Sequence, residues 1–132
     1  MENSGKLSVR VYTSRAELPV EGATVVVTQN GERGKYNLLS VQVTDSSGLI
    51  QPITIPAPPA WESEEPAGEG MGAPFALCNV WAEHPGYTML EVEGVQIFPG
   101  IETVQEMALA PLAEGETSLQ RRDLRRLTVQ TL

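Results

Sequence analysis

The chain has 132 residues and a formal net charge of −8, because 17 acidic residues face 9 basic ones. This length suffices for one domain with a single hydrophobic core. An acidic surface is repelled by phosphate backbones and anionic lipid, so we expect no nucleic-acid partner and no membrane partner. The one cysteine, Cys78, excludes an internal disulfide and a cysteine-rich zinc site, and its apolar neighbours predict a buried, inert thiol.

The N-terminus predicts synthesis in the cytoplasm without a signal peptide. The residues Met1 to Lys6 are polar, and no apolar segment follows a basic start. No apolar run approaches the roughly 20 residues that a membrane-spanning helix needs. Release of the protein by cell lysis, or by a route that needs no signal peptide, stays open at this point.

The first third of the chain reads as short strands separated by turns. Apolar and polar residues alternate from Leu7 to Tyr12, which is the period of a half-buried strand. A turn follows, and residues 23–28 form a second strand. The Asn30-Gly31 pair predicts a hairpin, after which Val41 and Val43 continue the alternation.

A second turn is predicted at residues 44–48. The Asp45 side chain can cap this turn, and Gly48 can adopt the positive φ that such turns require. Residues 49–55 then return as a strand, and Pro52 suggests that this strand lies at an edge of its sheet.

Residues 56–74 form a long acidic loop rich in proline and glycine. Loops of this length are uncommon in compact domains and are usually functional or disordered. Its four glutamates are Glu62, Glu64, Glu65 and Glu69, and this proline-broken arrangement fits a solvated loop better than a calcium site. Trp61 either covers the end of the domain or stays exposed as a binding anchor, so it is a candidate partner-binding residue.

The strands resume after the loop, over residues 75–81, 88–93, 94–97 and 101–109. Trp81 shares a strand face with Phe75 and Leu77, and we expect it to pack in the core. Seven to eight short strands at hairpin spacing predict an all-β Greek-key sandwich. The expected division is an arm at 1–5, a sandwich domain at 6–112 and a basic tail at 113–132.

The tail carries four of the nine cations between Arg121 and Arg126. It reads either as a helix, capped at Thr117 or Ser118, or as a strand over residues 127–132 that adds to an exposed sheet edge. The residues of the tail that we expect to bind a partner are Arg121, Arg122, Arg125, Arg126, Leu127 and Val129.

The turn sequences resemble those of a known family of sandwiches. The segments 7–11, 19–25, 44–48 and 85–87 are similar to carboxypeptidase regulatory-like and transthyretin-like domains. A narrower resemblance rests on residues 55–59, 74–75, 84–87, 93–100 and 109–112. These are similar to the N-terminal domain of spore cortex-lytic enzymes and related peptidoglycan-binding proteins of Firmicutes, so the resemblance implies an association with the spore or cell envelope.

No catalytic group of residues emerges from the sequence. His84 is the only histidine, and one histidine cannot assemble a multi-histidine metal site. We therefore expect no enzymatic activity, no cofactor and no metal.

The sequence favours a non-catalytic interaction module that mediates protein–protein association or self-assembly. The partner would be another protein or a second copy bound through the tail, with cell-wall glycan as a further candidate. The alternative is a carbohydrate-binding module that uses exposed aromatic residues such as Trp61, Tyr87 or Phe98.

Overall fold

A computed structural model describes residues 4–30, 35–56, 75–112 and 122–126, and in the last range only the course of the backbone. The described residues form eight strands and no helix, which confirms the predicted all-β sandwich. The strands are β1 (Ser4–Thr13), β2 (Thr24–Asn30), β3 (Tyr36–Val43), β4 (Ile53–Pro56), β5 (Ala76–Glu83), β6 (Met89–Ile97), β7 (Glu102–Leu109) and β8 (Arg122–Arg126).

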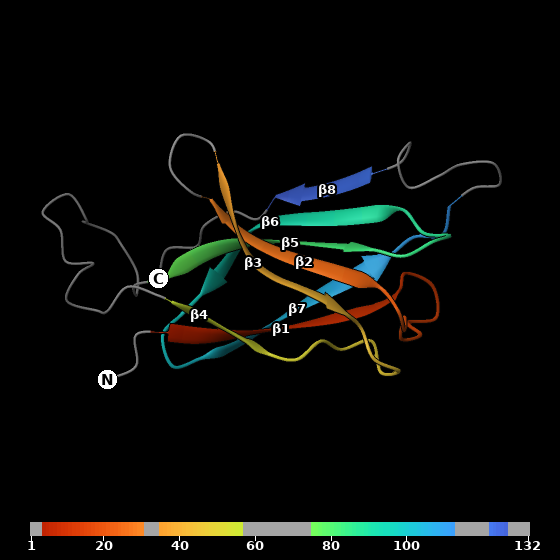
Figure 1. Ribbon diagram of the computed structural model, residues 1–132. Coiled ribbons are helices and arrows are strands. Elements are labelled where there is room, and N and C mark those ends of the chain that lie inside the picture. The colour runs from red at the N-terminus through yellow and green to blue at the C-terminus, as the bar shows by residue number, and fades with distance from the viewer. Residues whose placement is uncertain (1–3, 31–34, 57–74, 113–121, 127–132) are drawn as a thin grey trace, which may run out of the picture.

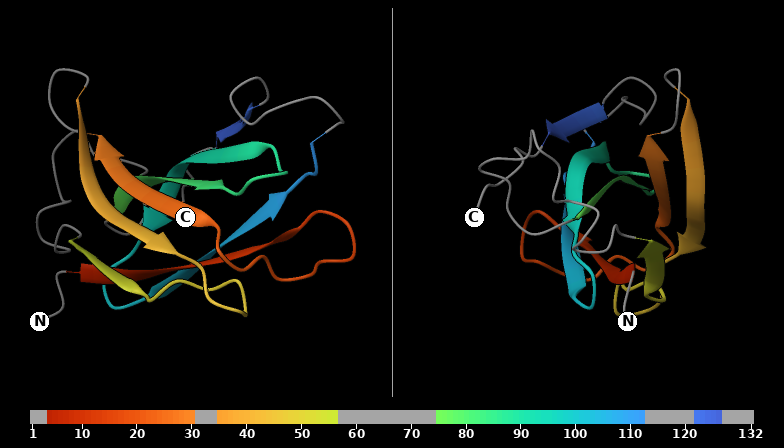
Figure 2. Two further views of the ribbon diagram at one scale, coloured as in Figure 1. Left: turned by 45° about the vertical axis from the view of Figure 1, so that its right-hand side comes forward. Right: turned by 90° about the vertical axis from the view of Figure 1, so that its left-hand side faces the viewer.

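The strands make two sheets that face each other (Figure 1). The smaller sheet has the order β4-β1-β7, and the larger one has the order β3-β2-β5-β6-β8. Neighbouring strands are antiparallel, except that β1 runs parallel to β7 and β6 runs parallel to β8. Figure 2 shows the two layers closing around a common interior, with β3 at the outer side of the larger sheet.

The core lies between the two sheets and is built from alternate residues of each strand. In β1, Leu7, Val9 and Val11 point inward and are fully buried, as the alternation predicts. Val25 and Val27 of β2 face them from the larger sheet. The remaining fully buried side chains of the largest size are Ile55, Val80, Val92, Val95, Ile97, Met107 and Leu109.

The turn after β3 has the predicted capped form. The Asp45 carboxylate accepts hydrogen bonds from the backbone N–H groups of Ser47 (2.8 Å) and Leu49 (3.0 Å). Gly48 has a φ of 77°. The turn therefore satisfies its own backbone donors through a side chain, which is what the Asp-Ser-Ser-Gly sequence favours.

The predicted strands differ from those in the structure at two places. The strand expected over residues 49–55 is the short β4, because Pro52 cannot donate to a sheet ladder and Leu49 makes one isolated bridge to Arg10. The segments 88–93 and 94–97 form one continuous strand, β6, in which an irregularity in the pairing with β5 accommodates one extra residue.

Trp81 is not a core residue, contrary to expectation. Cys78, Val80 and Ala82 turn inward from β5 and are buried, so the opposite face of the strand carries Trp81 outward, where 38% of it is exposed. The residues of β5 alternate between the two faces as predicted, but the face with the smaller side chains, Cys78, Val80 and Ala82, is the one that points into the core.

The basic tail contributes β8, which pairs with β6 in the register Met89↔Arg122 to Glu93↔Arg126. The helical alternative is therefore wrong for residues 122–126. The strand expected over residues 127–132 lies outside the described residues. The division into arm, sandwich domain and tail stays a prediction.

None of the described segments is a helix of the length and hydropathy needed to cross a membrane.

Candidate functional site

The most unusual surface of the molecule is the outward face of the larger sheet. Strands β3, β2 and β5 place seven apolar side chains there, with polar residues between some of them, and we call these seven residues the outer face. Its members are Tyr36, Leu38, Val41, Val43, Val26, Leu77 and Trp81. Four of them, all on β3, are between 56% and 63% exposed.

The register of the strands lines these side chains up across the sheet. Val26 lies opposite Val41 on one side and opposite Trp81 on the other, so the three form one row. Val26 is only 9% exposed because its two neighbours cover it. Directly opposed side chains in antiparallel strands are close enough to pack, so this row is one apolar surface.

A polar network on β2 and β5 interrupts the outer face, because Asn79 lies between Leu77 and Trp81 on the same side of β5. The Asn79 side chain is buried, donates a hydrogen bond to the Asn30 side chain (3.0 Å) and accepts one from the backbone N–H of Gly94 (3.4 Å). These bonds tie three strands of the sheet together. The outer face therefore sits on a rigid support.

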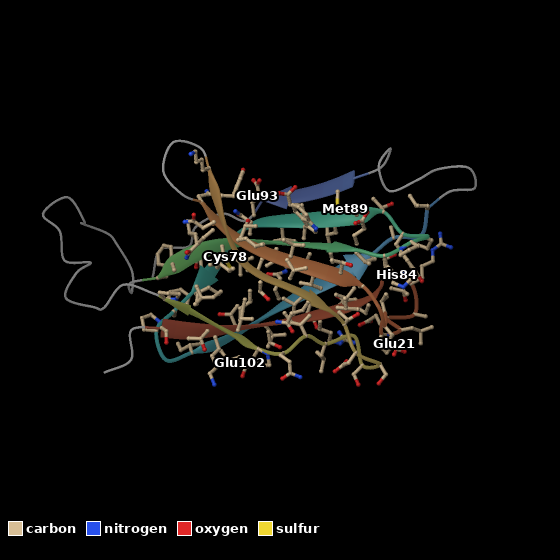
Figure 3. The ribbon with its side chains drawn as sticks, in the orientation of Figure 1. Glu21, Cys78, His84, Met89, Glu93 and Glu102 are labelled. Carbon is tan, nitrogen blue, oxygen red and sulfur yellow. The ribbon has the colours of Figure 1, made fainter. Side chains whose placement is uncertain are left out.

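Acidic residues follow the outer face on β6. Glu91 continues the row of Val26 and Trp81, and Glu93 lies two residues further along the same side of the strand. Figure 3 shows Met89 and Glu93 on β6, next to β8. The larger sheet thus changes from apolar at β3 to acidic at β6, where the basic segment Arg122–Arg126 pairs with it.

This arrangement suits the binding of another protein surface. Antiparallel sheets that face water normally carry polar residues on that side. A contiguous apolar surface rimmed by polar residues marks an interaction site, whereas single exposed apolar residues do not. The outer face is a sheet surface and not a pocket, so its geometry fits a second polypeptide better than a small ligand.

One hollow lies on the smaller sheet. It has a volume of about 430 Å³ and is lined by Ser4, Gly5, Lys6, Thr54, Gly100, Ile101 and Glu102. Lys6 stands in register between Thr54 and Glu102, and all three side chains are exposed. Figure 3 shows Glu102 at this side of the molecule. Because the side chains of Lys6, Thr54 and Glu102 are exposed to water, they are not desolvated groups of the kind that select a ligand.

Neither reactive side chain singled out from the sequence is part of a catalytic arrangement in the described residues. Cys78 is buried, as predicted, and burial raises the pKa of its thiol from 9.0 to about 12, so the thiol is inert. His84 lies at one end of the sandwich, where its Nδ1 is 2.8 Å from the Pro85 carbonyl oxygen and its ring packs edge-on against Tyr87. The described residues hold no group of three or more His, Cys, Asp or Glu side chains that could bind a metal ion.

Of the predicted partner-binding residues, none that the structure describes lies on a strand of the outer face. Trp61, Arg121, Leu127 and Val129 lie outside the described residues, and Arg122, Arg125 and Arg126 belong to β8 at the opposite edge of the sheet from β3. Sequence analysis predicted the strand character of Val41 and Val43 but did not single out β3 as a surface. Residues 36–43 have no charge, no proline and no glycine, which marks a strand but does not say that it lies exposed at a sheet edge.

Solved structures with the same fold are enzymes. Catechol 1,2-dioxygenase from Acinetobacter radioresistens matches with a TM-score of 0.53 at 15% identity, over 93% of this chain and 58% of that chain. Its A72G mutant gives a TM-score of 0.55 over the same shares. The 3-chlorocatechol 1,2-dioxygenase from Rhodococcus opacus matches with a TM-score of 0.54 at 13% identity, over 85% of this chain and 62% of that chain.

These likenesses show the fold. The chain spans less than two thirds of the length of these dioxygenases. No protein-family model and no curated protein matches the sequence.

The comparisons correct the family resemblance. The structural neighbours are catechol dioxygenases. The resemblance to carboxypeptidase regulatory-like and transthyretin-like domains and the narrower one to spore cortex-lytic enzymes are therefore wrong, and so are the words spore, peptidoglycan and Firmicutes attached to them. The physical reason is that part of the resemblance rests on turn residues, such as 85–86 and 99–100. Turn residues follow from backbone geometry, and that geometry recurs in sandwiches of unrelated function.

The functional expectations from the sequence are corrected together with the family resemblance. The chain was expected to be a non-catalytic module, with carbohydrate binding as the alternative and no enzymatic activity. The neighbours that share its fold are enzymes, so these three expectations are wrong as stated.

Proposed function

We propose that this chain is the β-sandwich subunit of an enzyme and that its outer face binds the second polypeptide that completes this enzyme. The observation that carries the proposal is the apolar row Val41–Val26–Trp81 with its exposed neighbours on β3. Covering such a surface with another protein removes apolar area from water, which is the main driving force of association.

The structural neighbours support the enzymatic part of the proposal. In the catechol dioxygenases the matching region is 58% to 62% of the chain, so each of those enzymes holds further polypeptide beside its sandwich. An apolar sheet face on the isolated sandwich is a surface on which such additional polypeptide can pack.

The loss of binding that a substitution on the outer face should cause can be estimated from the side chains exposed there. Aromatic residues at the centre of an interface contribute most of its binding energy, and Trp81 lies on the central strand β5. A lysine in place of Leu77, four residues before Trp81 on the same side of β5, puts a charge into the contact. We expect it to weaken binding about tenfold or more, which corresponds to about 1.4 kcal/mol.

The test starts with the tagged chain in an extract of its source cells. A polypeptide that is retained in stoichiometric amount is identified by mass spectrometry, purified, and titrated with three proteins: the wild type, Leu77→Lys and Leu49→Lys. The last is a matched control, because Leu49 is 38% exposed and Leu77 39%, but Leu49 bridges to β1 of the smaller sheet. Binding that is lost in Leu77→Lys and kept in Leu49→Lys supports the proposal. Equal binding of both variants overturns it.

Trp81 provides a second readout of the same contact. The chain has two tryptophans, so Trp61→Phe leaves Trp81 as the only one. We expect its emission to shift to shorter wavelength and its quenching by acrylamide to fall when the second polypeptide binds. Oxygen uptake in the presence of catechol is the first activity to measure on the assembled protein, because catechol is named for the neighbours.

A further inference from the structure

Strand β8 is attached to the sandwich along one side only. Among the described strands it pairs with β6 alone, in parallel, over five residues. Figures 1 and 2 show it beside β6 and away from the strands of the smaller sheet. Parallel pairing is slightly less stable per residue than antiparallel pairing, so a ladder of this length needs further contacts to stay formed.

The hydrophobic core does not supply these contacts. Leu90 and Val92 of β6 are buried in the core. The residues of β8 in register with them are Asp123 and Arg125, which are both charged. At the positions where β8 could extend the core, its sequence therefore offers no apolar residue.

The other parallel pair of the molecule shows what a core contribution looks like. Strand β7 pairs with β1 over eight residues and places Met107 and Leu109, both fully buried, in the core. The one apolar residue of β8 is Leu124, and it stands in register with Glu91, on the outward side of β6. Burial of apolar surface thus holds β7 but contributes little to holding β8.

Opposite charge is the contact that remains. Three of the five residues of β8 are arginines and one is an aspartate, whereas the paired stretch of β6 carries Glu91 and Glu93 and no cation. Glu93 stands in register with Arg126. The chain as a whole has a net charge of −8, so the rest of the molecule also attracts this basic strand.

We infer that opposite charge holds β8 on β6 and that a rise in salt releases β8 while the rest of the sandwich stays folded. The distance over which exposed charges act falls from about 30 Å at about 0.01 M salt to about 3 Å at about 1 M. Salt also screens the repulsion among the acidic residues of the chain and leaves its apolar core intact. The same change that weakens the hold on β8 therefore does not weaken the core.

Release of β8 changes the edge of the larger sheet. The N–H and C=O groups of Met89–Glu93 that point toward β8 lose their partners, and β6 becomes the edge strand. The inference goes beyond the proposed function, because it concerns this edge, whereas the proposed function concerns the outer face on β3, β2 and β5.

The first experiment is hydrogen exchange of the full chain at low and at high salt. The amides of Met89–Glu93 that point toward β8 should exchange about tenfold faster at about 1 M salt than at about 0.01 M. Amides of the same strand that bond to β5 are the internal control and should keep their protection. Equal protection of the β8-facing amides at both salt concentrations, or a loss shared by the β5-facing amides, overturns the inference.

Two double variants test whether the glutamates of β6 are responsible. Removing both charges with Glu91→Gln and Glu93→Gln should speed exchange of the β8-facing amides about fivefold at low salt, as for two exposed ion pairs. Glu102→Gln with Glu106→Gln is the matched control, because it removes the same charge from β7, including the partner of Arg10. Equal exchange in the two double variants contradicts the role given to β6.

Trypsin detects release in a different way, because it cleaves after arginine only where the backbone has left its sheet. Three such sites lie in β8. Their cleavage in the full chain is divided by that in a free peptide of the same sequence, which corrects for the effect of salt on trypsin. This ratio should rise with salt, while cleavage after Arg10, between β4 and β7, stays slow. A ratio that does not change with salt, whether high or low, overturns the inference.

Discussion

The side chain of Thr44 donates a hydrogen bond of 2.6 Å to the backbone carbonyl of Val20, 24 residues earlier in the chain. The same hydroxyl accepts a hydrogen bond of 2.9 Å from the N–H of Ala23, and Thr44 is 4% exposed. One buried hydroxyl thus holds the turn before β2 against the segment that follows β3.

Replacing this hydroxyl should destabilise the fold more than its size suggests. Thr44→Val keeps the volume but leaves the buried Ala23 N–H and Val20 carbonyl without these bonds. We expect the free energy of unfolding to fall by about 2–3 kcal/mol, as for buried polar groups that lose their partners. Urea unfolding measures the change. Thr44→Ser, which keeps the hydroxyl, should lose less than Thr44→Val, and the reverse order would contradict the role given to these bonds.

Two glycines with similar backbone angles should respond differently to alanine. Gly48 has φ +77° and Gly86 has φ +90°, so a side chain is strained at both. A Cβ at Gly48 would lie 2.3 Å from the carbonyl oxygen of Val11, whereas a Cβ at Gly86 would meet nothing within 4 Å. We expect Gly86→Ala to cost about 1–2 kcal/mol from backbone strain alone. Gly48→Ala should cost clearly more, because the clash is with backbone, and equal unfolding free energies would refute this difference.

The buried thiol makes stability depend on pH in the alkaline range. Burial raises the pKa of Cys78 from 9.0 to about 12. Below pH 9.0 the thiol is protonated in both the folded and the unfolded chain, so its stabilising contribution is complete. Between 9.0 and about 12 the unfolded chain loses this proton and the folded chain keeps it, so the free energy of unfolding falls as pH rises.

The check is to compare the wild type with Cys78→Ala by denaturant unfolding across this pH range. The difference in stability between the two proteins should shrink as pH rises, because only the wild type contains this thiol. A difference that stays constant would show that the thiol ionises equally in both states.

Removing the tail should loosen β6. In a chain that ends at Leu112, β8 is absent and the side of β6 that pairs with Arg122–Arg126 faces water. Backbone amides of Met89–Glu93 that point toward β8 should exchange their hydrogens faster than in the full chain. Protection that is the same in both chains would mean that β8 does not pair with β6 in solution.

The fold was predictable because its signals are local. Alternating residues mark β1, and the Asp45–Gly48 turn has the side-chain caps that its sequence favours. Which side of a strand points into the core depends less on the local sequence. Trp81 looks like a core residue in its own segment, but the core is filled by Cys78, Val80 and Ala82, because the strands opposite already supply large side chains.

The candidate site was not predictable for a related reason. An uncharged strand with several apolar residues looks the same whether it lies inside a sheet or at its edge. The edge position of β3 depends on which strands pair, and β2 takes β5 as its second neighbour although 45 residues separate the two strands in the sequence. Exposure of Leu38 and Val41 follows from that pairing and from no feature of residues 36–43 themselves.

The parallel pairing of β1 with β7 has a consequence for how the chain is made. Arg10 bonds to Glu106 at 3.0 Å across this pair, 96 residues apart, so β1 must wait for a neighbour that is synthesised much later than itself. The smaller sheet cannot close before Leu109 has been synthesised. Until then β1 is an unpaired apolar strand on that side, and long-range pairing of this kind is slow. The nascent chain therefore depends on its own completion, or on a chaperone, to keep Leu7, Val9 and Val11 from contacts with other chains.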